Sequence, residues 1–114
     1  MVTLLLMLAA TTAEVDKAGR DLFNALRDYQ VEYLKHKTDP QIDSKLAIIY
    51  ECVWDSLVYS HKGVDEKVVS LIRSQHQAVI ELEKLNYYPD LQSLFRKIQT
   101  AANKLFSLFI DKGV

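Results

Sequence analysis

Three histidines and one cysteine are the side chains of this sequence best suited to bind a metal or to react. Glu32 and His36 lie four residues apart, which places them on one face if the segment is helical. Paired iron sites in helical bundles use Glu-x-x-His together with further carboxylates, and the sequence has no Glu-x-x-His. We interpret His36 as a charge near a helix C-terminus, and we predict no metal site.

His76 is the second candidate for chemistry, because it lies beside Val69 and Ile80 on an expected helix. Catalysis by histidine needs a partner acid or nucleophile, and the sequence places none next to it. Glu51 and Asp55 are one helical turn apart and are interpreted as solvated carboxylates. We predict no catalytic residue and no cofactor. The alternative is an enzyme or cofactor binder with a pocket near His76.

Cys52 is the only cysteine, so the chain forms no internal disulfide and no cysteine-based zinc site. It lies in an apolar run, where a free cysteine acts as a small buried hydrophobe. One unpaired cysteine favours a reducing compartment, and we expect a cytoplasmic protein. The net charge of −1 gives no electrostatic reason to predict nucleic-acid binding.

The whole chain, residues 1–114, is predicted to be one all-α domain. Only three glycines and two prolines occur among 114 residues, too few for the turns of a β-protein. Apolar residues recur at helical spacing in four segments, about 11–33, 40–60, 65–85 and 89–112. Asp39 and Pro40 form a typical helix start. Short connections between helices of similar length predict an up-down-up-down four-helix bundle.

The apolar stripes identify the expected core. It comprises Leu22, Leu26, Leu46, Ile49, Val53, Ile72, Val79, Leu94 and Ile98. On the second helix a further row widens the stripe: Ala47, Tyr50, Trp54 and Val58. Because this is the most apolar helix, we expect it to be the most enclosed.

Residues 1–13 carry no charged side chain. The segment either extends the first helix or forms an additional short apolar helix. A cleaved signal peptide, which would make the chain a secreted helical signal protein, is disfavoured because no basic residues precede the apolar run. The run is also too short for a transmembrane span, which needs roughly 20 apolar residues.

Apolar side chains near both termini exceed what one bundle stripe requires. In this topology the two termini lie at the same end, so we predict an intermolecular contact there, most simply a homodimer. The predicted contact residues are Leu5, Leu6, Phe106, Phe109 and Ile110. Tyr87 and Tyr88 form either a plug over the other end or a second contact surface.

These observations favour a non-enzymatic helical bundle that acts by binding another protein or by self-association. In size and four-helix pattern the chain resembles the small cytosolic immunity proteins that protect bacteria from their own bacteriocins. That resemblance, which includes no diagnostic residue, implies the alternative of an inhibitor that neutralises a toxin or bacteriocin.

Overall fold

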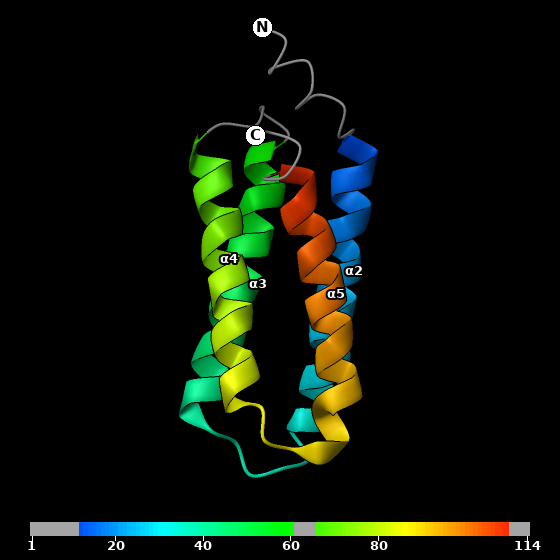
Figure 1. Cartoon of the computed structure of the whole chain (residues 1–114), viewed down its shortest axis with the longest axis vertical. Coiled ribbons are helices and arrows are strands. Elements are labelled where there is room, and N and C mark those ends of the chain that lie inside the picture. Colours follow the sequence, from blue (N-terminus) through cyan, green and yellow to red (C-terminus); the bar gives the residue numbers. More distant parts are fainter. Residues whose placement is uncertain (1–11, 61–65, 110–114) are drawn as a thin grey trace, which may run out of the picture.

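The computed structural model describes residues 12–60 and 66–109, which form four α-helices and no strand (Figure 1). The helices are α2 (Thr12–Tyr33), α3 (Pro40–Ser60), α4 (Glu66–Leu85) and α5 (Gln92–Phe109). A single 3₁₀ turn, η1 (Pro89–Leu91), precedes α5. Successive helices run in opposite directions, so the predicted up-down-up-down four-helix bundle is confirmed.

The start of α3 follows from the two residues predicted to begin it. The backbone N–H of Gln41 donates to Asp39 Oδ1 at 2.8 Å, so Asp39 caps the helix. Pro40 is the first helical residue, where a missing N–H costs nothing. In the connection between α4 and α5, Tyr88 has an extended backbone ahead of Pro89, because the ring of a following proline disfavours the helical conformation.

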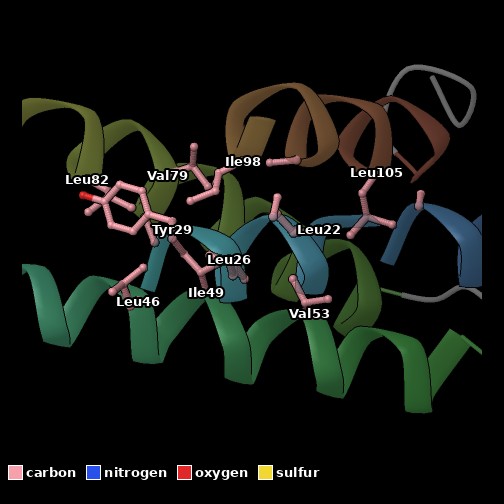
Figure 2. Close-up of a cluster of buried hydrophobic side chains, with 14 of the residues drawn as sticks. Leu22, Leu26, Tyr29, Leu46, Ile49, Val53, Val79, Leu82, Ile98 and Leu105 are labelled. Atoms are coloured by element: carbon pink, nitrogen blue, oxygen red, sulfur yellow. The ribbon is translucent and has the colours of Figure 1, made fainter. Parts of the chain in front are cut away.

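The four helices form a ring in the order α2, α3, α4, α5, with α5 closing back on α2. The α3–α4 and α2–α5 pairs pack most extensively, while the α2–α3 and α4–α5 pairs make less extensive contact. Side chains from all four helices meet along the axis, among them Leu22, Ile49, Val79 and Ile98 (Figure 2).

Most of the expected core is confirmed. Eight of the nine predicted members are buried; Leu94 is partly buried at the edge of the core. Cys52 is also buried, and burial together with the nearby Asp55 and Glu51 carboxylates raises the pKa of its thiol.

The expectation that the second helix is the most enclosed is wrong. Trp54 and Val58 of α3 are 61% and 44% exposed, and Ala47 is exposed as well. The physical reason is the ring geometry, because each helix buries only the face between its two neighbours. Three members of the row that seemed to widen the core stripe of α3 therefore lie at the surface, while Tyr50 is partly buried against the core.

Candidate interaction surface

An apolar strip runs along the exposed side of α3 next to α2. It consists of Ala47, Tyr50, Trp54 and Val58 of α3 with Phe23 of α2, and we call it the Trp54 strip. The α3 members are separated by three, four and four residues, which aligns them on one helical face. Large exposed apolar side chains arranged contiguously are uncommon on monomeric proteins and mark interaction sites.

Aromatic contacts across the α2–α3 seam hold the strip in place. The Phe23 ring stacks on Tyr50 with centroids 6.0 Å apart and lies 6.2 Å from the Trp54 ring in a tilted arrangement. Tyr50 Oη donates to Gln30 Oε1 at 3.3 Å. Burial raises the pKa of Tyr50, whereas the nearby Arg27 charge lowers it. Trp54 thus projects into solvent from a base fixed by its neighbours.

Gly19 allows α2 and α3 to approach each other closely next to the contact of Phe23 with Tyr50 and Trp54. A Cβ atom at Gly19 would lie 2.7 Å from Leu57 Cδ1, closer than carbon atoms pack. A glycine on α2 therefore accommodates the Leu57 side chain of α3. This contact also fixes the register, because Gly19 is opposite Leu57 and Phe23 lies between Tyr50 and Trp54.

Charged residues flank the Trp54 strip on both sides. Arg20 and Arg27 are exposed on α2, and Glu51 and Asp55 are exposed on α3. On the α3 helix Glu51 and Asp55 lie to the side of Trp54 that faces away from α2. The strip is therefore bordered by a basic row on one side and an acidic row on the other.

Tyr88 closes one end of the bundle, as the plug interpretation of the sequence requires. Its Oη donates to the Lys37 carbonyl at 2.8 Å, and its ring stacks on His36 with centroids 4.3 Å apart. His36 Nε2 in turn lies 2.8 Å from Asp90 Oδ2. These contacts join the α2–α3 connection to the segment that leads into α5.

Tyr87 differs from its neighbour, because it is 62% exposed. Its Oη still donates to Asp39 Oδ2 at 3.2 Å. The adjacent Tyr88 hydroxyl, partial desolvation and the Asp39 carboxylate raise the pKa of Tyr87 to about 12. The structure therefore divides the pair into an inward-packed Tyr88 and a surface Tyr87, whose role as a contact stays a prediction.

The residues predicted to form a contact near the termini are only partly within the described chain. Leu5, Leu6 and Ile110 lie outside the described residues. Phe109 is 4% exposed and belongs to the core. Phe106 is partly buried, with its ring stacked on His76 at 4.2 Å between centroids. Intrachain packing therefore covers much of these two phenylalanines, and a dimer through this end stays a prediction.

Among the described residues, no acid or nucleophile is placed beside His76 to orient it as a catalytic base. Its ring lies against Phe106, and its buried Nδ1 has no hydrogen-bond partner among the described residues. A catalytic histidine is normally oriented through that second nitrogen. No group of three or more His, Cys, Asp or Glu side chains in residues 12–60 and 66–109 is arranged to hold a metal ion.

Several open grooves lie on the described part of the bundle, and two of them contain charged side chains from adjacent helices. One lies between α2 and α5, and its lining includes Ala25, Ala101, Asp28, Lys97 and Lys104. The other, between α3 and α4, contains Lys45 and Glu81, whose side chains form an ion pair at 2.5 Å. In both grooves basic and acidic side chains are interspersed, so neither presents one sign of charge to a ligand.

None of the described helices is long and apolar enough to cross a membrane. Comparison with known proteins found no matching family model, no similar curated protein and no similar solved structure. The function is therefore inferred from the geometry of this chain.

The sequence pattern identified the four α3 members of the Trp54 strip as apolar but placed them in the core, and it gave Phe23 of α2 no role. A signal for their exposure was present, since Glu51 and Asp55 share the outer face of the same helix. Unpaired carboxylates are almost never enclosed, so a helix face that carries both must meet solvent.

Proposed function

We propose that this protein is a non-enzymatic interaction module that binds another protein chain through the Trp54 strip. The observation that carries the proposal is the 61% exposure of Trp54 on a base of packed aromatic rings. Tryptophan and tyrosine are the residues most enriched among those that dominate binding energy at protein interfaces. Charged residues of α2 and α3 border the strip, and protein interfaces commonly have such a polar rim around an apolar centre.

Rigidity supports this proposal as much as exposure does. Phe23 packs against both Tyr50 and Trp54, and Tyr50 is further held by Gln30. A side chain already fixed in its bound orientation loses little conformational entropy when a partner covers it. An apolar strip of this kind gains the free energy of burial with a small ordering cost.

The role of an inhibitor that neutralises a toxin belongs to the same class, because such a protein acts by covering a partner surface. A cytoplasmic location also stays a prediction. A contact at the bundle end near the termini would be a second interaction surface, separate from the Trp54 strip.

Photo-crosslinking tests the proposal. We would place a benzophenone amino acid at position 58, beside Trp54, and irradiate both the purified protein and cells of the native host. The expected result is a covalent adduct with a protein chain, either this protein or another. Adding Trp54→Asp is expected to reduce the adduct yield at least tenfold, because a buried acid opposes docking.

The matched control places the same photoreactive residue at position 80 and compares Ile80→Asp with Trp54→Asp. Ile80 is an exposed apolar residue of α4, away from the strip. It is expected to give no comparable adduct, and Ile80→Asp should leave the position 58 adduct intact. Equal adducts from positions 58 and 80, or none from position 58, would overturn the proposal.

A further inference from the structure

Within residues 12–60 and 66–109, most of the charged side chains around the Trp54 strip form no ion pair. Arg20, Glu51 and Asp55 form no ion pair in the described residues, and Arg27 has only the adjacent Asp28 at 3.9 Å. Glu51 and Asp55 are like charges one helical turn apart, an arrangement that destabilises an isolated helix slightly. A partner that brings cations to the acidic row and anions to the basic row would supply the missing ion pairs and reduce the repulsion between Glu51 and Asp55.

The two rows lie at corresponding levels along the bundle. Because Gly19 is opposite Leu57 in the antiparallel α2–α3 pair, Arg20 is nearly level with Asp55. The Phe23 contacts to Tyr50 and Trp54 give the same register. Continuing it, Arg27 lies within two or three residues of the level of Glu51, an offset of about 3–5 Å at 1.5 Å per residue. Arginine side chains are long enough to span that offset.

We infer that the partner that covers the Trp54 strip is a second copy of this chain, related by a two-fold axis parallel to the bundle. This inference rests on the proposed function and names its partner. The rotation places α2 of each copy against α3 of the other. It brings Arg20 to Asp55 and Arg27 to Glu51 of the second copy, and symmetry repeats both pairs.

The orientation of the axis follows from the positions of the charges. A two-fold axis across the bundle would place α2 against α2 and α3 against α3, so that arginines would face arginines and carboxylates would face carboxylates. The parallel axis instead gives four opposite-charge pairs around an apolar centre. Trp54 then meets α2 of the second copy, where Phe23 and Arg27 offer aromatic and cation–π contacts.

The size of the face indicates a reversible dimer. Two adjacent helices of about 20 residues cover an area of roughly 30 by 20 Å, or about 600 Å² per copy. Specific interfaces begin near 1,200 Å² in total, so this contact lies at the small end of that range. The equilibrium should therefore be followed over a wide range of protein concentration.

A charge-swap experiment tests the arrangement directly. One variant combines Glu51→Arg with Asp55→Arg, and the other combines Arg20→Glu with Arg27→Glu. Each variant alone presents like charges across the interface, and sedimentation equilibrium should show its dimer weakened at least tenfold. Mixing the two variants restores every opposite-charge pair, so a heterodimer should form with affinity near that of the unmodified protein.

Matched controls carry the same change in net charge on helices away from the strip. Arg96→Glu with Lys97→Glu on α5 is the control for Arg20→Glu with Arg27→Glu, because both make the chain more negative by four charges. Glu66→Arg with Glu83→Arg on α4 is the control for Glu51→Arg with Asp55→Arg, because both make it more positive by four. Both controls should dimerise like the unmodified protein, and mixing them should give no preference for the heterodimer. Circular dichroism verifies that all variants keep their helix content.

The outcomes separate this inference from the proposed function. A dimer lost in Trp54→Asp but unaffected by the charge swap overturns the two-fold arrangement and leaves the interaction role intact. A monomer that crosslinks from position 58 to a different protein overturns self-association alone. A dimer that survives Trp54→Asp uses another surface and overturns the inference. A monomer with no adduct, or with one formed inside a single chain, overturns both.

Discussion

Gln75 of α4 is fully enclosed, and neither its Oε1 nor its Nε2 has a hydrogen-bond partner among the described residues. An amide group removed from water without new partners lowers stability by about 1–3 kcal/mol. The residue therefore weakens the bundle at a position where periodicity alone would allow an apolar side chain.

We expect Gln75→Met to increase the free energy of unfolding by about 1–3 kcal/mol, because methionine keeps the length of the side chain and removes the polar atoms. Urea denaturation measures the change. Gln77→Met is the control, since Gln77 is exposed and its Nε2 donates to Glu81. A loss of stability in Gln75→Met would show that the amide has a stabilising partner.

Tyr29 shows the opposite case, a buried polar group that is satisfied. Its Oη donates to Asn86 Oδ1 at 2.7 Å, and burial raises its pKa well above the ordinary 10. The folded chain thus holds the phenolic proton more tightly than the unfolded chain does. The resulting stability is complete below pH 10 and is lost as the pH rises above 10 towards the folded-state pKa.

Tyr29→Phe should therefore lower the free energy of unfolding by about 1 kcal/mol at neutral pH, where Asn86 loses its donor. Above pH 10 the unmodified protein should lose stability more steeply than the variant, so the difference between them should shrink. Urea titrations at pH 8, 10, 11 and 12 measure this convergence. Parallel curves throughout would show that ionisation of Tyr29 is not linked to unfolding.

At the scale of single residues, the sequence predicts the centre of each stripe better than its edges. Leu22 and Ile49 stand at the centre of their stripes and are fully buried. Leu94 and Trp54 stand at the edges, where a rotation of the helix by a few tens of degrees decides between core and solvent. That rotation depends on the neighbouring helices, and the spacing of one segment does not contain it.

Helix boundaries were predictable because their chemistry is local. Pro40 and Ser60 bound α3 as expected, and the capping role of Asp39 depends only on adjacent residues. The contact between α2 and α3 was not predictable in this way. Gly19 appears in the sequence as a residue of low helix propensity inside a helix. Only the position of Leu57 on another helix explains why a glycine is needed there.

Gly19→Leu should lower the free energy of unfolding by about 1–3 kcal/mol, because the larger side chain collides with Leu57. Leu57→Ala in the same chain should recover part of the loss by making room. Chemical denaturation of the single and double variants measures the coupling between the two positions. Additive effects would show that the helices separate at this point instead of sharing the contact.

For the whole molecule, the sequence predicted topology but not which surfaces remain open. The apolar residues selected near the termini include Phe109, which the core takes up, while the strip around Trp54 faces solvent. Each helix sequence specifies an apolar face, but the ring of four helices decides how much of that face is covered. Interaction surfaces are a property of the assembled bundle for this reason.

The end of the bundle beside Tyr88 joins two connections that are about 50 residues apart in sequence. The Tyr88 hydroxyl donates to the Lys37 carbonyl and the Tyr88 ring stacks on His36, while Asp90 Oδ2 lies 2.8 Å from His36 Nε2. A bundle end held by side chains from both connections should open as one unit.

Tyr88→Ala removes the shared ring and should accelerate amide hydrogen exchange in residues 34–39 as well as in residues 86–91. The free energy of unfolding should fall by about 1–3 kcal/mol, less than for a fully enclosed aromatic residue, because Tyr88 is only partly buried. Tyr50→Ala is a matched control, since Tyr50 is a half-buried tyrosine of the Trp54 strip and should leave both connections protected. Mass spectrometry of exchanged peptides measures each segment separately. Faster exchange confined to residues 86–91 would mean that the connections open independently, and that the contacts of His36 with Tyr88 and Asp90 do not couple them.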